Sequence, residues 1–230
     1  MHFASHYRWL VATRQLGLPQ AYQTPLLDVG TNAGDWPALI RAPLVAGLDL
    51  RPARGARVTL VQGNALALPF PAAVFGHVWV FDVIEHVPDD RGLLAEGLRV
   101  LRPGGCLWLS TTAAGYRLWP GGAVQRRLER SWGHVRRGYS GGDLRALVPA
   151  HVQVQIIEWN EPLLRALYVP LKSVQMLPGG PALLQRLIPL LYAVDARLSR
   201  GQRGHLFACL HKPAETGGAA MPAGDRVARA

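Results

Sequence analysis

The sequence predicts an α/β fold in which a seven-stranded, mainly parallel sheet carries helices on both faces. Short β-type apolar runs alternate with helix-type segments through most of the 230 residues, a pattern typical of parallel sheets. The chain is long enough for one such domain with a large core and too short for two ordinary ones. We expect the strands at residues 25–30, 45–49, 58–62, 77–82, 106–112, 152–159 and 205–211.

Two helices have clear sequence boundaries. The first begins at Asp89, where leucines recur at i, i+4 and i+7 and acids occupy the first turn. Pro103 and the two glycines that follow it are expected to end this helix and turn the chain into the next strand. A second, short helix is predicted just after Ser140, because Ser140 and Asp143 have the spacing of a capping box.

Residues 161–199 form an apolar insertion before the last strand. Five prolines interrupt it, so we expect short, kinked helical pieces. Its bulky side chains are too many for one helix face, which leaves four candidates to cover them: the protein's own core, a second subunit in a homodimer, a lipophilic substrate, or a membrane surface. We interpret residues 1–212 as one domain with a helical lid at 161–199, and residues 213–230 as a disordered tail.

Composition narrows the class of protein. Hydrophobic residues make up 49% and charged residues 17%, which is typical of a globular protein. There is no apolar run of about 18 residues and no continuous apolar segment near the N-terminus, so we expect a cytoplasmic protein, with peripheral contact to the inner membrane as an alternative. The net charge of +10 favours anionic partners. Cys106 and Cys209 lie in apolar runs without a Cys/His motif, and we interpret them as buried thiols.

The stretch "LLDVGTNAGDW" at residues 26–36 is typical of a ligand-binding turn. An apolar strand runs into a glycine turn and a helix, which places backbone N–H groups at the carboxyl end of the strand. Asp49 ends the next strand 21 residues after Asp28, the spacing of an acid that binds ribose hydroxyls. The alternative is that the glycines only make a tight turn and Asp49 caps the next segment. G-x-G-x-x-G is not matched, which disfavours NAD.

Further motifs follow this turn in order. "LDL" at 48–50, "GNALALPF" at 63–70, "DVIEHVPD" at 82–89 and "LRVLRPGG" at 98–105 together resemble class I S-adenosylmethionine-dependent methyltransferases, especially the group that includes quinone-biosynthesis and other small-molecule enzymes. The resemblance covers residues 24–148, and the strand pattern extends it to 211. It implies a Rossmann-like three-layer sandwich whose last strand is antiparallel, and S-adenosylmethionine as the cofactor.

The resemblance also implies roles for single residues. Asp28, Gly30, Asn32 and Gly34 would surround the methionine part of the cofactor. Asp49, with Leu50, would hold the ribose, and Asp82 would face the amino acid end. The adenine would lie at Asn64, Ala65 and Leu66, where an asparagine carbonyl replaces the family's usual acid.

Asn32 departs from the family's usual glycine. If the position requires positive φ, asparagine is among the best non-glycine residues there, at a cost of about 1 kcal/mol or less. The side chain could also crowd the ligand, so a catalytically inactive relative is an alternative.

Two histidines are candidate bases for an oxygen acceptor. His86 in "IEHV" and His134 in "WGHVRRGYS" fall in loops expected at the ligand edge, and histidine suits proton removal near neutral pH. Each could instead make a structural hydrogen bond. "DVIEH" partly resembles the metal-binding segment of small-RNA 2′-O-methyltransferases, but no second histidine follows at close spacing, and we predict no metal.

Arginines cluster around residues 126–137. Arg136, Arg137 and Tyr139 are candidate substrate-binding residues for an anionic acceptor, and an exposed helix face with solvated arginines is the alternative. A nucleic-acid groove would usually add more aromatic residues and a longer basic track. The leading hypothesis is therefore a methyltransferase that acts on an oxygen of a small, lipophilic or anionic molecule. The alternatives are an inactive cofactor-binding protein, an RNA methyltransferase and an NAD(P)-dependent oxidoreductase.

Overall fold

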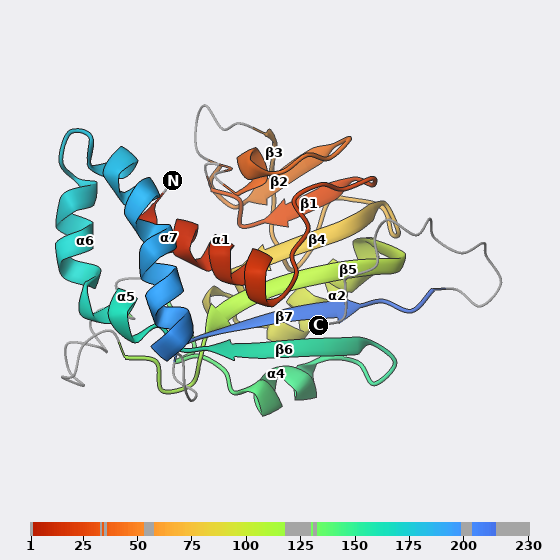
Figure 1. Ribbon diagram of the computed structural model, residues 1–230. Helices are drawn as coiled ribbons and strands as arrows, with labels where there is room; N and C mark the ends of the chain where they lie inside the picture. Colours follow the sequence, from red (N-terminus) through yellow and green to blue (C-terminus); the bar gives the residue numbers. More distant parts are fainter. Residues whose placement is uncertain are drawn as a thin grey trace.

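The computed structural model describes residues 2–32, 34, 36–52, 58–117, 130, 133–198 and 204–214. Its centre is a seven-stranded sheet with the order β3-β2-β1-β4-β5-β7-β6 (Figure 1). Strand β7 is antiparallel to both of its neighbours, β5 and β6, and the other paired strands are parallel. The strands are β1 (Leu26–Val29), β2 (Val45–Asp49), β3 (Thr59–Gln62), β4 (Phe75–Phe81), β5 (Leu101–Thr112), β6 (Gln153–Trp159) and β7 (His205–His211).

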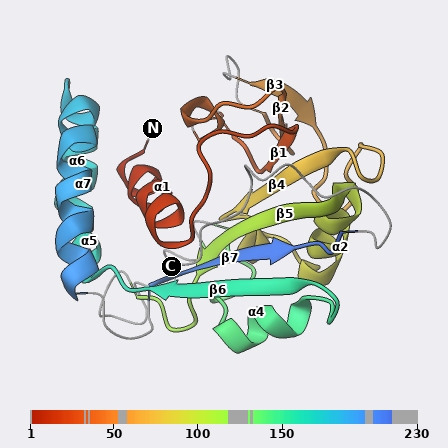
Figure 2. The ribbon, with the colours of Figure 1, turned by 45° about the vertical axis from the view of Figure 1, so that its right-hand side comes forward.

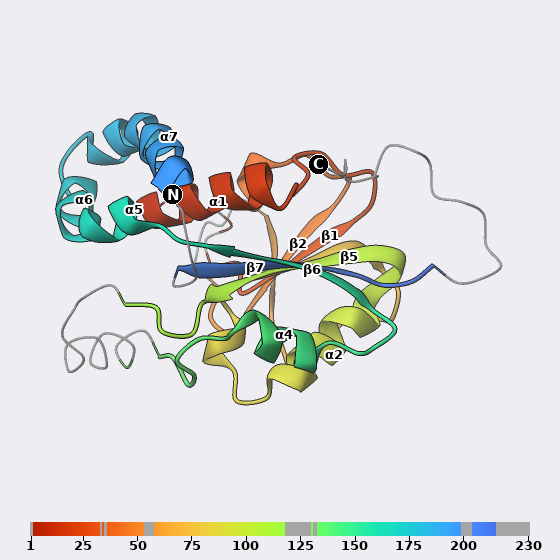
Figure 3. The same ribbon diagram turned by 60° about the horizontal axis from the view of Figure 1, so that its bottom comes forward.

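Helices cover both faces of the sheet, which confirms the predicted three-layer sandwich. Figure 3 shows α2 (Asp90–Val100) and α4 (Gly141–Leu147) on one face, and α1 (Phe3–Gln15) on the other with α5 (Pro162–Ala166), α6 (Tyr168–Gln175) and α7 (Gly180–Leu198) beside it. Side chains alternate across the sheet because strands have a period of two. In β4, Val78 and Val80 pack toward α2, whereas Trp79 packs toward α1.

The two predicted helix boundaries are close to the observed ones. Helix α2 is capped by the Asp89 side chain, and α4 begins with the predicted capping box of Ser140 and Asp143. The turn at Pro103 is different. Strand β5 begins at Leu101, directly after α2, and the register between β4 and β5 shifts before Cys106. The proline and glycines therefore form an irregular stretch within β5, with Gly104 at φ +77°.

One helix was missed, and one expectation about a helix was wrong. Helix α1 was not predicted, although it covers the sheet beside β4. The turn after β1 leads only into a three-residue 3₁₀ turn, η1 (Pro37–Leu39). Pro37 fits a first helical turn, but Arg41 then forms a β-bridge with Ala21 and Pro43 follows, so the chain returns to extended structure before a helix can grow.

The insertion consists of three helices, of which α5 and α6 are short, as predicted, and α7 is 19 residues long with Pro189 inside it. Helix α7 packs on α1 and lies on the outside of the molecule (Figure 2). No described helix is both long and apolar enough to cross a membrane. Most of the predicted disordered tail, from residue 215, lies outside the described residues.

Candidate functional site

The turn after β1 is held against the end of β2 by Asp49. One carboxylate oxygen of Asp49 accepts the Asn32 backbone N–H at 3.0 Å, and the other accepts that of Arg51 at 2.9 Å. Asn32 has φ +46° and Gly30 has φ +76°, so this position does require the left-handed conformation in which asparagine is tolerated. Asp49 caps the turn, and each of its oxygens retains a second lone pair that a ligand hydroxyl can use.

Two cavities open beside this turn. The first, about 300 Å³, is lined by Gly30, Asp49, Leu50, Asn64 and Ala65 together with residues that follow β4. The second, about 240 Å³, is lined by Asp28, Gly30, Thr31, Asn32, Asp82 and three apolar or small residues. Eight of the ten residues predicted to bind a cofactor therefore come together at the carboxyl ends of β1, β2, β3 and β4, where α/β sheets bind ligands.

The two remaining residues shape the backbone nearby. Gly34 closes the turn by donating its N–H to the Thr31 carbonyl at 2.8 Å, with φ +71°. The Leu66 N–H donates to the Asn64 side-chain oxygen at 2.9 Å. That bond holds the Asn64 side-chain oxygen against the Leu66 backbone.

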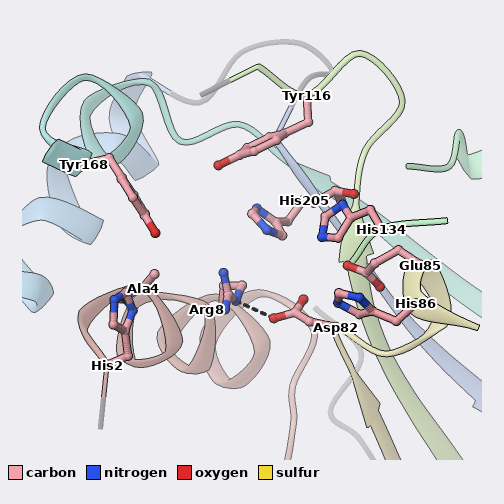
Figure 4. Close-up of a pocket in the computed structure, with 11 residues that line it drawn as sticks. His2, Ala4, Arg8, Asp82, Glu85, His86, Tyr116, His134, Tyr168 and His205 are labelled. Carbon is pink, nitrogen blue, oxygen red and sulfur yellow. Dashed lines mark hydrogen bonds and ion pairs between the residues drawn. The ribbon is translucent and has the colours of Figure 1, made fainter. Parts of the chain in front are cut away.

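A third cavity, of about 310 Å³, lies between the end of the sheet and the N-terminal helix (Figure 4). Asp82, Glu85 and His86 line it from the segment after β4, and Arg8 lines it from α1. Figure 4 shows Tyr116 and Tyr168 across the cavity from Asp82. Asp82 lines all three cavities and His86 lines two of them, so the three spaces meet at the end of β4.

Asp82 is fixed in place by two partners. Its carboxylate lies 2.8 Å from Arg8 Nε and accepts the Ser110 hydroxyl at 2.8 Å, and its backbone has φ +54°. Burial alone would raise the pKa of this carboxyl, but the charges of Arg8 and His205 and the Ser110 hydrogen bond hold it below its usual value. The structure therefore keeps a carboxylate ionised where the three cavities meet.

Glu85 lies in the opposite electrostatic situation three residues later. It is 1% exposed and accepts the Thr111 hydroxyl at 3.0 Å. Burial, and then the negative charge of Asp82, raise its pKa to about 7. Burial likewise raises the pKa of Asp28 to about 7. Both acids therefore exchange protons near neutral pH.

These two pKa values predict that stability falls as pH rises. From the ordinary carboxyl values of 4.5 and 3.8 up to about 7, the native state binds more protons than the unfolded state, so the free energy of unfolding decreases with pH. We expect Glu85→Gln to make this slope shallower and Asp28→Asn to remove a further part. Melting temperatures recorded from pH 5 to pH 8 measure the effect, and equal slopes in the wild type and Glu85→Gln would contradict it.

The two candidate bases come together in the third cavity. The rings of His86 and His134 are 4.8 Å apart and nearly perpendicular. His86 Nδ1 lies 3.2 Å from the Gly133 carbonyl, and the Val135 N–H donates to the Glu85 carbonyl at 2.9 Å, which joins the two segments. The second histidine missing at close spacing is thus supplied 48 residues later. Ligand atoms of Glu85, His86 and His134 lie within 4.8 Å of one another, a spacing that could hold a divalent cation.

Sequence reasoning named only Asp82, His86 and His134 among the residues that line this cavity, and it missed Arg8, Tyr116, Tyr168 and His205 among others. His205 Nδ1 lies 2.6 Å from the buried Glu161 Oε1. Since β7 is antiparallel, its first residue lies at the same edge as the last residues of the parallel strands, and Tyr116 follows β5 at that edge. The positions of His205 and Tyr116 could therefore have been predicted from the strand order and directions of the sheet. Arg8 and Tyr168 belong to α1 and α6, whose placement depends on tertiary packing.

The candidate substrate-binding residues lie elsewhere. Tyr139 is 3% exposed, and its hydroxyl donates to the Ile84 carbonyl at 3.2 Å. Arg136 Nη2 lies 3.1 Å from the Asp90 carboxylate at the start of α2. Neither they nor Arg137 line the three cavities described above. The arginines at 126 and 127 lie outside the described residues.

A methyl group at Gly30 is predicted to destroy the first two cavities. In the Gly30→Ala variant the new Cβ would clash with Val83 Cγ2, at a φ of +76° that alanine disfavours. We expect ligand binding at these cavities to weaken at least about 100-fold, because the turn must shift. Asn32→Gly is the matched change, and it should alter binding by less than about tenfold and stability by about 1 kcal/mol or less. Calorimetric titration of both variants tests this contrast.

Comparison with known proteins relates the site to one family. Residues 27–109 match the model of a methyltransferase domain. Demethylmenaquinone methyltransferases of Listeria welshimeri and Thermus thermophilus are 33% and 34% identical over 122 residues, which cover 46% of this chain and 51% and 55% of theirs. The chain therefore aligns with about half the length of these curated relatives.

Solved structures share the fold over most of the chain. A sarcosine dimethylglycine methyltransferase described as putative from Galdieria sulphuraria covers 91% of this chain and 86% of its own, with a TM-score of 0.59 and 15% identity. A phosphoethanolamine N-methyltransferase of Haemonchus contortus, solved with S-adenosylmethionine, covers 91% of this chain and 52% of its own, with a TM-score of 0.60 and 15% identity. The [4+2]-cyclase SpnF covers 90% of this chain and 81% of its own, with a TM-score of 0.55 and 22% identity.

Proposed function

We propose that the chain is a class I S-adenosylmethionine-dependent methyltransferase, which the methyltransferase-domain match at residues 27–109 supports, and that it transfers the methyl group of S-adenosylmethionine to an oxygen of a small-molecule acceptor. One observation supports the proposal above the others. Asp82 stands where two cavities at the glycine turn meet a third cavity that contains two histidines. This arrangement supports a cofactor site and an acceptor site that would share a wall at Asp82.

The residues present fit the cofactor in two parts. In the 300 Å³ cavity, Asp49 can accept from the ribose hydroxyls and Asn64 lies beside Ala65 at the adenine end. In the 240 Å³ cavity, the buried Asp28 and the ionised Asp82 face the methionine end, where a carboxylate can bind an ammonium group. The sulfonium of the bound cofactor would supply the reactive methyl group.

The third cavity fits an acceptor that must lose a proton. His86 and His134 can each accept the proton of a hydroxyl nucleophile, and Tyr116 and Tyr168 narrow the cavity opposite them. The protein's main contribution would be to hold the hydroxyl in line with the transferred methyl group, since orientation can account for much of such a rate enhancement. The ion pair of Arg8 with Asp82 closes the cavity on the α1 side.

The acceptor class we propose is a lipophilic molecule with a ring hydroxyl. The curated relatives above are named for demethylmenaquinone, and the lid helices bear many exposed apolar side chains. The fold also occurs in a cyclase, so fold alone does not determine the reaction. Product analysis is therefore essential, and it should be able to distinguish methylation on oxygen from methylation on carbon.

Two measurements test the proposal. Calorimetry should detect S-adenosylmethionine binding to the wild type and none of comparable strength for NAD. Incubation with cell extract and labelled cofactor, followed by mass spectrometry, should reveal a methylated lipophilic product. Binding of S-adenosylmethionine without a methylated product would favour a catalytically inactive cofactor-binding protein. No binding of S-adenosylmethionine would overturn the cofactor assignment.

Helix α7 has two apolar faces, and the domain covers only one of them. The exposed face supports contact with a membrane surface. Its inner face, with Leu184, Ile188 and Leu191, is buried against the domain. The outer face exposes Leu183, Leu187, Leu190, Val194 and Leu198 at successive helical spacings. Lys172, Arg186 and Arg197 are exposed on α6 and α7. We propose that this outer face, which we call the α7 stripe, docks on an anionic membrane surface and admits a lipophilic acceptor.

Liposome sedimentation tests this docking. The wild type should pellet with anionic vesicles at low salt, and Leu187→Glu combined with Leu190→Glu should remain in the supernatant. Leu44, which is 48% exposed in a loop before β2, provides a matched control, and Leu44→Glu should pellet like the wild type. If the wild type stays in solution and sediments as a dimer, the α7 stripe is a subunit interface instead.

A further inference from the structure

Two cysteines and a histidine meet on the sheet far from the three cavities. Cys106 Sγ lies 3.0 Å from His211 Nδ1, and Cys209 Sγ lies 3.3 Å from His211 Nε2. The three donor groups all lie within 4.8 Å of one another. The sequence separates Cys106 from the other two residues by more than 100 positions, which is why no metal-binding motif could be read along the chain.

The pairing of β5 with β7 explains this cluster. Cys106 and His211 are directly opposite each other in the antiparallel ladder, and Cys209 precedes His211 by two residues, so all three side chains lie on one face. At the other end of the same ladder, Thr112 pairs with His205, and both of these residues line the third cavity. The cluster therefore lies at the opposite end of the β5–β7 ladder from the third cavity, and Figure 1 shows these two strands side by side.

We propose that Cys106, Cys209 and His211 bind a thiophilic d¹⁰ cation, with Zn²⁺ as the one that best fits two thiolates and an imidazole. A metal suits these positions better than a disulfide. Diagonal neighbours in an antiparallel pair have Cα atoms about 7–8 Å apart, which exceeds the usual reach of a disulfide without backbone movement. A cation at about 2.3 Å from each sulfur spans the longer separation.

The surroundings allow a fourth ligand to reach the cation. The cysteines are buried, at 8% and 1% exposed, whereas His211 is half-buried and its partner in β6, Gln153, is exposed. Water or the Gln153 amide oxygen can complete a tetrahedral set from that side. A cation held there would tie β5 to β7 and thereby stabilise the native state in proportion to its binding free energy.

Cobalt substitution of the full chain tests the proposal directly. After chelation and removal of bound metals, one equivalent of Co²⁺ should produce a thiolate-to-cobalt charge-transfer band, and Zn²⁺ should abolish it. Cys106→Ser, Cys209→Ser and His211→Gln should each weaken Zn²⁺ binding at least about 10- to 100-fold, since even the loss of an outer partner has that effect on metal sites. His134→Gln should retain the band, which separates this site from the Glu85, His86 and His134 cluster.

A second measurement requires no variant. Zn²⁺ should protect both thiols of the wild type from alkylation and raise its melting temperature, and a chelator should reverse both effects. Folded wild-type protein without a thiolate-to-cobalt band would overturn the proposal. So would a band that persists in the double variant Cys106→Ser, Cys209→Ser, or one that disappears in His134→Gln.

Discussion

Glutamine in place of the histidine that acts as the proposed base should lower kcat for an oxygen acceptor by about 10²- to 10⁴-fold, the usual contribution of a general base. His86 and His134 are the two candidates, and their rings lie 4.8 Å apart in the third cavity, which we propose for the acceptor and call the acceptor cavity. Only the ring that removes the proton should show the full loss in kcat. The other should show a smaller change, mainly in KM, if it only orients the acceptor.

The pH dependence separates a base from a structural histidine. A general base should give the pH profile of kcat a rising limb, and the glutamine variant of that base should lack it. Glu85, whose pKa is raised to about 7 by burial and by Asp82, borders the same cavity, so Glu85→Gln must be profiled alongside. His151, which is exposed in the turn before β6, provides the control. A full loss of kcat in His151→Gln, or in neither His86→Gln nor His134→Gln, would contradict the assignment.

The strands were predictable because their signal is local. Each strand is an apolar run bounded by turn residues. In six of the seven observed strands, both the first and the last residue lie within two positions of the predicted limits. Strand β5 is the exception, since Leu101 starts it where a helix end was expected. The positions at the glycine turn were also predictable, because a strand end and its turn are adjacent in sequence.

Helix α1 was not predictable in the same way. A surface helix shows one apolar stripe, but α1 is buried on more than one side because it lies between the sheet and α7. Phe3, Tyr7 and Val11 are buried along one line, and Trp9 is buried on another. Its polar residues, such as Arg8, point into the acceptor cavity and interrupt the pattern. The residues that complete a functional site can thus obscure the helix that carries them.

Convergence of distant residues was the other signal that sequence could not provide. His86 and His134 were each identified from their loops, but their contact depends on the hydrogen bond between Val135 and Glu85. Cys106, Cys209 and His211 meet only because β7 inserts antiparallel beside β5 in one register. A shift by one residue would turn the side chains of β7 to the other face.

Asp195→Ala should produce the largest loss of stability among the variants proposed for this protein. It should also affect acceptor binding more than cofactor binding. Asp195 is fully buried in α7. Its carboxylate accepts the Tyr7 hydroxyl at 2.8 Å and the backbone N–H groups of Leu163 and Leu164 at 2.8 Å and 3.1 Å. It therefore joins α7 to α1 and caps the N-terminus of α5, where a negative charge is favourable.

The loss of stability in Asp195→Ala follows from the hydrogen-bond donors that the variant would leave unpaired. Each buried donor without a partner costs about 1–3 kcal/mol, so Asp195→Ala should lower the free energy of unfolding by about 3 kcal/mol or more. Asp143→Ala removes an exposed capping carboxylate, which accepts from the Ser140 backbone N–H and hydroxyl, and should cost only about 1 kcal/mol, which makes it the matched control for denaturant titration.

The functional consequence of Asp195→Ala should be selective. The cavities proposed for the cofactor are bounded mainly by β1, β2 and β4, whereas the acceptor cavity includes Arg8 from α1 and Tyr168 from α6. Under conditions where the variant remains folded, affinity for S-adenosylmethionine should stay within about tenfold of the wild type, while KM for the acceptor should rise more steeply. If affinity for S-adenosylmethionine and KM for the acceptor changed equally, the prediction of a selective effect would be wrong. The coupling would then run through α1, because Ser5 of α1 lines the 240 Å³ cavity.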